Sequence, residues 1–191
     1  MIRRPPRSTL DRSSAASDVY KRQVRDDIAK KIALELDRTA IYGTGSSNQP
    51  LGLKDTSGIG SQSLTSFGTF PEYIGMETDV AVANAEGGSM KYLINASARG
   101  ALKSTEKTST STANFVFENN QINGYDAIVS NQLLNNDAIF GDFSQFIVGM
   151  WSGLDLTVDP YAGATAGTVR IIALQDIDYA IRQAGAFCFA T

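Results

Sequence analysis

The sequence predicts an α+β fold in which helices come first and strands follow. Apolar residues recur every four positions over residues 24–42, which is the spacing of an amphipathic helix. A second helical pattern covers residues 71–85, starting at a proline and ending before two glycines. From residue 114 onward, short runs rich in Val, Ile, Phe and Thr are separated by Gly and Asn turns. Early helices followed by strands differ from the alternating order of a parallel α/β fold.

Each element has its own signal. The first helix carries its apolar stripe on Val24, Ile28, Ile32 and Leu36, and Gly43 ends it. We expect this stripe to be buried against a sheet formed by the strands after residue 138. A short buried strand at residues 90–94 leads to Asn95, which is expected to cap a helix through about Lys103. The later strands are expected at residues 114–118, 127–130, 138–140, 146–151, 154–158, 168–174 and 186–190.

The composition excludes several kinds of chemistry. The 191 residues include no histidine and one cysteine, Cys188. Histidine-dependent catalysis, an internal disulfide and a cysteine-based zinc site are therefore excluded. An apolar content of 42% is enough for a core without disulfides or a structural metal. We predict no catalytic, cofactor-binding or metal-binding residue, and no cofactor.

Four short patterns in the sequence are candidate sites. Gly43 and Gly45 resemble part of a dinucleotide loop, but they follow a helix and lack a third glycine, so a structural connection is favoured. Asp176 and Asp178 would share one face of a strand, as a carboxylate pair or, more simply, as a solvated edge. The other two patterns are the glycosylation sequon at residues 95–97, better explained by a helix cap, and Cys188, expected to be a small buried residue opposite its two phenylalanine neighbours.

Charge is divided unevenly along the chain. Residues 1–23 carry six basic and two acidic side chains, whereas residues 24–191 carry 11 basic and 18 acidic ones, a net charge of −7. Such an acidic body lacks the electrostatic pattern of a nucleic-acid reader. The most apolar uncharged stretch, residues 143–154, is far shorter than the roughly 20 residues of a membrane span.

The first 23 residues resemble translated sequencing-adapter DNA. A disordered basic tail is the alternative that the composition also allows. We expect this segment to be non-native or disordered, to make almost no long-range contacts, and to be excluded from fold reasoning. In this interpretation Val24 is a truncation point.

Four segments together resemble the major capsid proteins of tailed phages. They are residues 139–161 (IFGDFSQFIVGMWSGLDLTVDPY), residues 168–182 (TVRIIALQDIDYAIR) closed by Gly185-Ala-Phe187, the loop at 42–52 after the first helix, and the step at 90–95 (MKYLIN). They follow the family's order over most of residues 24–191. The resemblance implies a Hong Kong 97-like fold, with a spine helix and a peripheral sheet beside an axial domain of mixed sheet and helices.

The resemblance also implies a domain organisation. Its parts are a non-native or disordered segment at 1–23, the spine helix and following loop of the peripheral domain at 24–60, an axial domain at 61–137, peripheral strands at 138–182, and a terminal strand returning to the axial domain at 183–191. The family's N-terminal arm and extended loop have no counterpart here. A Lys–Asn cross-link between subunits, known in some relatives, finds no support because no asparagine follows Asn136.

The function implied by the resemblance is that of a non-enzymatic shell subunit. Its partners would be copies of itself in hexamers and pentamers, with scaffold, portal or decoration proteins, around DNA that is enclosed without sequence-specific binding. Its location would be the virion, after assembly in the host cytoplasm, with no membrane contact. We expect a complete parent protein to close into a shell and this 191-residue chain not to. The alternatives are an encapsulin-type compartment, a hydrolase using Asp176 and Asp178, and a jelly-roll capsid or tail protein without the long helix.

Overall fold

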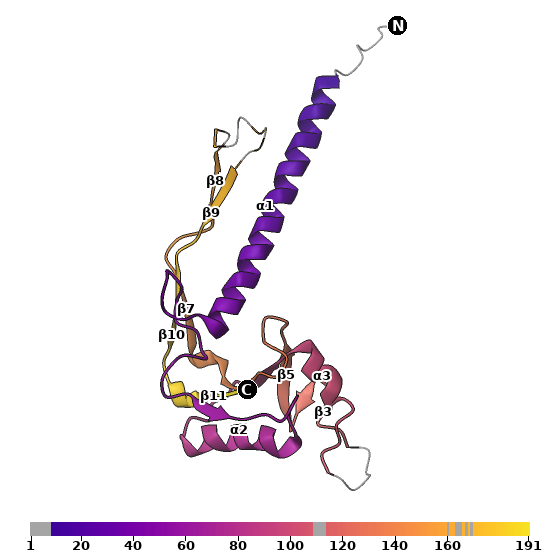
Figure 1. Cartoon of the computed structure of the whole chain (residues 1–191), viewed down its shortest axis with the longest axis vertical. Coiled ribbons are helices and arrows are strands. Elements are labelled where there is room, and N and C mark those ends of the chain that lie inside the picture. The colour runs from indigo at the N-terminus through magenta and orange to yellow at the C-terminus, as the bar shows by residue number, and fades with distance from the viewer. Residues whose placement is uncertain (1–8, 109–113, 160, 163–165, 167, 169) are drawn as a thin grey trace. The chain divides into compact units, whose positions relative to one another are not determined.

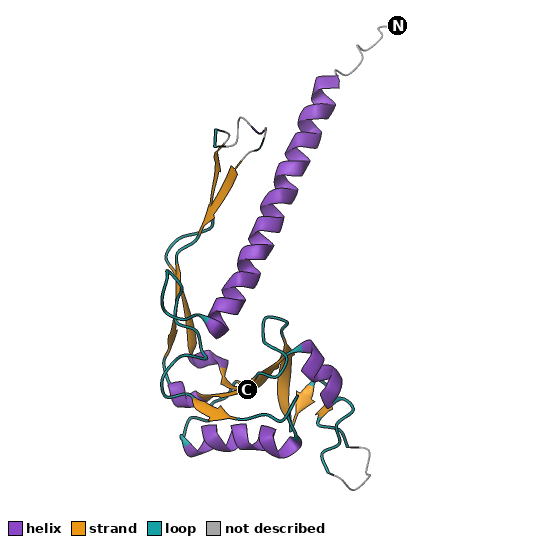
Figure 2. Cartoon of the chain, viewed as in Figure 1, coloured by secondary structure: helices purple, strands orange, loops and turns teal. Residues whose placement is uncertain are grey.

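The computed structural model describes residues 9–108, 114–159, 161–162, 166, 168 and 170–191 (Figure 1), without the side chains of residues 9–18, 20 and 21. The chain divides into two units, one of Met1–Leu36 with Gly153–Gln175 and one of Asp37–Ser152 with Asp176–Thr191. Helices precede most of the strands along the sequence. The chain contains both helices and strands (Figure 2), and the predicted α+β class is confirmed. The finer domain boundaries given above stay a prediction.

The first helix, α1, spans Thr9–Tyr42 and begins earlier than the predicted Val24. No proline or glycine lies between Thr9 and Tyr42, so nothing in the backbone chemistry stops the helix from extending toward the N-terminus. The predicted apolar stripe is partly buried at Ile28, Ile32 and Leu36, and the expectation of full burial there is therefore wrong. Whether residues 1–23 are native to the protein stays a prediction.

The chain turns back on itself directly after α1. The last carbonyls of the helix accept hydrogen bonds from the returning backbone, Ala40 from the Leu53 N–H at 2.9 Å and Ile41 from the Lys54 N–H at 2.9 Å. These bonds satisfy acceptors that a helix end otherwise leaves to solvent. Glycine is required at Gly43, where a Cβ would lie 2.6 Å from the Thr39 carbonyl oxygen. The predicted stop at Gly43 is confirmed.

The unit of Asp37–Ser152 and Asp176–Thr191 contains a seven-stranded mixed sheet in the order β1-β11-β6-β2-β5-β4-β3. Its strands are β1 (Gly60–Gln62), β2 (Met90–Ile94), β3 (Phe117–Glu118), β4 (Gln121–Ile122), β5 (Tyr125–Val129), β6 (Ala138–Asp142) and β11 (Phe187–Ala190). The pairs β1–β11 and β2–β5 are parallel, and the remaining neighbours are antiparallel. The central strand β6 is buried at every position, as a strand covered on both faces should be.

The strand register shows which buried residues lie on each face of this sheet. Tyr92 lies opposite Phe140, which lies opposite Cys188, and these residues share one face. The rings of Tyr92 and Phe140 are 4.5 Å apart between centroids. Leu93, Ile139 and Phe189 are paired in the same way on the opposite face. The prediction that Cys188 faces away from its phenylalanine neighbours and is buried is confirmed.

Two helices complete this unit. Helix α2 (Phe70–Val82) packs on the sheet through its buried residues Tyr73, Met76 and Val80, and it ends three residues before the predicted position. Helix α3 (Ala96–Leu102) begins at Asn95, whose Oδ1 accepts the Ser97 N–H at 2.8 Å. The predicted cap at Asn95 is confirmed.

The remaining strands form two separate two-stranded ribbons. In one, β7 (Phe146–Met150) pairs antiparallel with β10 (Ile177–Ile181). In the other, β8 (Asp155–Asp159) pairs antiparallel with β9 (Arg170–Leu174). Short 3-10 turns at Phe143–Gln145 and Ala184–Ala186 lead into β7 and β11. The strands expected at 154–158 and 168–174 are present as β8 and β9, whereas β1, β4 and β10 were missed.

Candidate functional site

The carboxylate pair weighed as a catalytic candidate lies on the surface. Asp176 directly precedes β10, and its N–H donates to Ser152 Oγ at 3.1 Å. Asp178 lies within β10, and its carboxylate accepts the N–H of the adjacent Tyr179 at 2.8 Å. Both aspartates are exposed. A general acid–base pair needs a shaped pocket around both carboxylates, and an exposed surface does not provide one.

The glycine pair that resembles part of a dinucleotide loop has its amide groups engaged elsewhere. The Gly43 N–H donates to the Thr39 carbonyl at 2.8 Å, and the Gly45 N–H donates to the Pro50 carbonyl at 3.3 Å. Phosphate loops present free backbone N–H groups to the anion. These glycines therefore shape the turn after α1, as the structural interpretation of the sequence proposed.

The other two candidates are also held inside the fold. Asn95 is 7% exposed, and its Nδ2 donates to the Leu133 carbonyl at 2.5 Å while its Oδ1 caps α3. Cys188 is fully buried, and its Sγ lies 3.6 Å from Asp79 Oδ2. Burial, together with the nearby Asp79 carboxylate, raises the pKa of the Cys188 thiol to about 12. Such a thiol is not a nucleophile at neutral pH.

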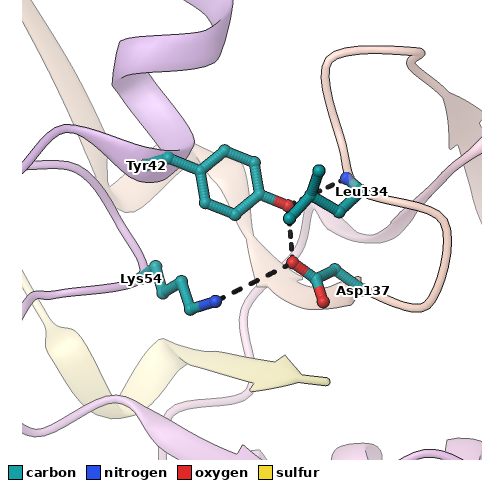
Figure 3. A network of polar contacts seen from close by, with 4 residues as sticks. All are labelled: Tyr42, Lys54, Leu134 and Asp137. Carbon is teal, nitrogen blue, oxygen red and sulfur yellow. Dashed lines mark hydrogen bonds and ion pairs between the residues drawn. The ribbon is translucent and has the colours of Figure 1, made fainter.

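A polar network that the sequence did not reveal fixes the end of α1 (Figure 3). The Tyr42 hydroxyl donates to Asp137 Oδ2 at 2.6 Å and accepts the Leu134 N–H at 2.9 Å. Lys54 Nζ lies 4.0 Å from the same Asp137 oxygen. Burial, and then the hydrogen bond to Asp137, raise the pKa of Tyr42 well above its usual range.

Aromatic rings complete the network around the lysine. Lys54 Nζ lies 5.2 Å from the centre of the Phe189 ring and 5.5 Å from that of Tyr42. Asp137 is 4% exposed, and a carboxylate buried to this extent needs hydrogen-bond and charge partners such as these. The network therefore joins the end of α1 and the chain that returns after it to the loop before β6, which is distant in the sequence. Its role is structural, and the sequence carries no local signal for it.

An apolar groove of about 380 Å³ lies against the sheet face opposite α2. Leu93, Ile139 and Phe143 line it together with Ile41 and Leu53. Its polar lining residues are Asp37 and Ser130, which are too few for a convergent catalytic constellation. Across the described part of the chain, no three His, Cys, Asp or Glu side chains are grouped so as to hold a metal ion. In the same residues, no helix has the length and apolarity to cross a membrane.

The two ribbons, in contrast, expose apolar side chains. On β8 and β9 the register places Leu156 and Val158 on one face with Ala173 and Ile171. Val158 is 54% exposed.

On the ribbon of β7 and β10, Trp151 is 73% exposed, and its ring lies over Gly149, where a Cβ would meet it at 3.0 Å. Isolated two-stranded ribbons are marginally stable in water, and contiguous exposed apolar surface marks interaction sites. The exposed apolar side chains of the ribbons therefore indicate a function in binding other proteins, whereas the described groove lacks the polar residues of a catalytic site.

Solved structures share the fold of this chain. The capsid of a native GTA particle, computed with C5 symmetry, matches with a TM-score of 0.67 at 16% identity, over 89% of this chain and 64% of that chain. The Gordonia phage Cozz structure matches with a TM-score of 0.63 at 15% identity, over 95% and 65%. A virus-like particle from Pyrococcus furiosus matches with a TM-score of 0.53 at 20% identity, over 73% and 58%. The predicted Hong Kong 97-like capsid fold is confirmed.

Sequence comparison gives the family. Residues 7–191 match the phage capsid family, and the chain belongs to it. The major capsid protein of Halomonas phage phiHAP-1 is 34% identical over 175 residues. That alignment covers 92% of this chain and 29% of the relative, so the chain spans less than a third of the relative's length. The recognition made from the four sequence segments is confirmed.

Proposed function

We propose that the chain acts as a structural subunit of a phage or prophage head. Copies of it, arranged as hexamers and pentamers, would form the shell that encloses the DNA genome. Membership of the phage capsid family is the observation that carries the proposal. The exposed apolar faces of the ribbons support it, because a subunit that closes a shell needs surfaces that other copies cover.

The same proposal includes what the subunit does not do. It has a structural role without enzymatic activity, which the exposed and separate positions of the candidate side chains support. DNA is enclosed without sequence-specific contacts, in keeping with the net charge of −7 over residues 24–191. The subunit is part of the virion and assembles in the host cytoplasm, and scaffold, portal or decoration proteins are its further partners.

Particle formation tests the proposal. Light scattering and electron microscopy would be applied to the chain and to any longer product of the same reading frame. Closed particles of uniform size support a shell subunit. Persistent monomers in every preparation, with hydrolytic turnover that is lost in Asp176→Asn and Asp178→Asn, would replace the proposal with the hydrolase alternative.

The contents of the particles separate the two kinds of shell. Particles formed in infected or induced cells would be treated with nuclease and then opened. Protected DNA supports the phage head. Protected enzyme without DNA supports the encapsulin-type compartment.

A further inference from the structure

Helix α2 has two apolar faces, and the sheet covers one of them. Tyr73, Met76 and Val80 are buried against the sheet. The outward positions between Pro71 and Val82 are exposed, and Val82 is 75% exposed while Ile74 is 38% exposed. We call this surface the outward face of α2, and its residues are Pro71, Ile74, Thr78, Ala81 and Val82. None of them is charged, although the solvent side of a surface helix is usually its charged side.

The carboxylates of α2 are all held at its flanks by other parts of the chain. Glu72 accepts the Thr69 N–H at the start of the helix at 2.7 Å. Glu77 accepts the Tyr92 hydroxyl at 2.6 Å. Further contacts to these carboxylates include Thr65 Oγ1 to Glu72 at 2.7 Å, Asn123 Nδ2 to Glu77 at 2.8 Å, and Gln62 Nε2 to Asp79 at 2.7 Å. No carboxylate of α2 therefore projects from the middle of its outward face.

The one hydroxyl of the outward face is also engaged. Thr78 Oγ1 donates to the Ile74 carbonyl at 2.9 Å, within the same helix. A partner that packs on this face thus covers methyl groups and a satisfied hydroxyl, and it leaves no unpaired polar side chain behind. The face is suited to a contact that excludes water.

We propose that the outward face of α2 is covered by a second copy of this chain in the assembled shell. This inference rests on the proposed function. Charge favours a copy over a foreign partner, because residues 37–152 and 176–191 carry 13 carboxylates against 7 basic side chains. Two such acidic surfaces repel each other unless the place where they meet is free of carboxylates. A basic partner would instead be recognised by exposed carboxylates.

The size of the face fits one contact among several. Thirteen residues of helix extend about 20 Å. One face of such a helix covers a few hundred Å², which is less than the roughly 800 Å² per partner of a stable two-body interface. A copy docked here alone would dissociate readily. In a closed ring of copies the contact is head-to-tail, and its contribution adds to those of the other surfaces.

Charge introduced on the face tests the inference. Ile74→Glu and Val82→Glu would be compared with the uncharged variants Ile74→Leu and Val82→Ile at the same positions. Sedimentation velocity and light scattering over a range of concentrations would report self-association of any form. We expect each glutamate variant to weaken association at least tenfold and the uncharged variants to match the wild type. Val82→Lys should weaken association less than Val82→Glu, and 0.5 M salt should reduce that difference.

Circular dichroism and thermal unfolding control for folding. Both positions are exposed, so the glutamate variants should unfold within a few degrees of the wild type. A second measurement uses Val82→Cys, since the native thiol of Cys188 is buried and does not compete for a maleimide. The new thiol should be labelled in dispersed subunits and protected in assembled ones.

The outcomes separate the two hypotheses. If the wild type assembles, and the glutamate variants assemble equally well or the thiol of Val82→Cys stays reactive in the particles, the inference fails while the proposed function stands. If the wild-type chain and its longer products remain monomeric at every concentration, the proposed function fails and the inference fails with it.

Discussion

The hydroxyl of Tyr42 donates a 2.6 Å hydrogen bond to Asp137, a residue 95 positions away in the sequence. The same oxygen accepts the backbone N–H of Leu134, so both hydrogen-bonding capacities of the phenol are used. The last residue of α1 is thereby joined to the loop that precedes β6, a strand that is buried at every position. This contact fixes the end of the long helix relative to the sheet of the same unit.

Removing this hydroxyl should destabilise the fold. In Tyr42→Phe the Asp137 carboxylate, 4% exposed, loses a short hydrogen bond, and the Leu134 N–H loses its acceptor. We expect a loss of about 1–3 kcal/mol in the free energy of unfolding, measured by urea denaturation. Tyr161→Phe is the matched control, because Tyr161 is 86% exposed and should change stability by less than about 0.5 kcal/mol. Equal effects of the two variants would contradict the structural role of the network.

The buried tyrosines predict a loss of stability at alkaline pH. Burial, and then hydrogen bonding to Glu77, raise the pKa of Tyr92 far above its usual value, and burial likewise raises the pKa of Tyr73 and Tyr42. Above pH about 10 the unfolded chain releases these protons while the folded chain retains them, so rising pH favours unfolding. Below that pH their contribution to stability is fully present.

Urea denaturation between pH 8 and 11.5 measures this effect. For each proton that the folded protein retains, the free energy of unfolding falls by about 1.4 kcal/mol per pH unit above the ordinary tyrosine pKa. Tyr92→Phe should make the slope shallower by about one proton, whatever it does to the stability at pH 8. A stability profile that is flat to pH 11.5 would show that these phenols ionise in the folded protein as they do in water.

The turn after α1 should tolerate no side chain at Gly43. A Cβ there would lie 2.6 Å from the Thr39 carbonyl oxygen, which belongs to the helix backbone and cannot move aside. We expect Gly43→Ala to destabilise the protein by about 1–3 kcal/mol.

The same substitution at Gly100, Gly100→Ala, should have the opposite effect on stability. Gly100 lies within α3, and a Cβ there meets no atom within 4 Å. Alanine is favoured over glycine in a helix by about 1 kcal/mol, so this variant should be more stable than the wild type. Thermal unfolding distinguishes the two, and a stable Gly43→Ala would mean that the turn is looser than described.

Local patterns in the sequence predicted elements whose causes are local. The four-residue period from Val24, the stop at Gly43 and the cap at Asn95 each depend on neighbouring residues, and the structure has all three. The strand β10 was missed although Ile177, Tyr179 and Ile181 alternate as in a half-buried strand. Its partner β7 is distant in the sequence, so the pairing itself leaves no local signal. The short strand β1 likewise depends on β11.

Contacts between distant residues could not be predicted from local patterns. The network around Asp137 joins three segments, and each member has an ordinary structural explanation when considered alone. The uncharged outward face of α2 could not be predicted from the sequence for a related reason. The helix sequence contains three carboxylates and suggests a charged surface, but the structure turns all of them toward partners at its flanks.

The buried thiol gives a prediction about the rigidity of the sheet. Cys188 is fully buried on β11, and burial together with Asp79 raises its pKa to about 12. At pH 8 the thiolate fraction of the folded protein is then lower than that of an ordinary cysteine by a factor on the order of a thousand. Reaction with a thiol reagent should therefore require opening of the sheet, and its rate should follow the population of the unfolded protein.

Thr191→Cys supplies the internal reference for this measurement. Residue 191 is exposed, three positions beyond Cys188 and just after the end of β11. In this variant one thiol should react within seconds to minutes and the second should react only as the protein unfolds, with a rate that rises steeply on adding urea. Mass spectrometry would assign each modified residue. Rapid modification of Cys188 in the native protein, at a rate independent of urea, would show that β11 opens without unfolding of the sheet and that the core around Phe140 and Cys188 is less firmly closed than its burial implies.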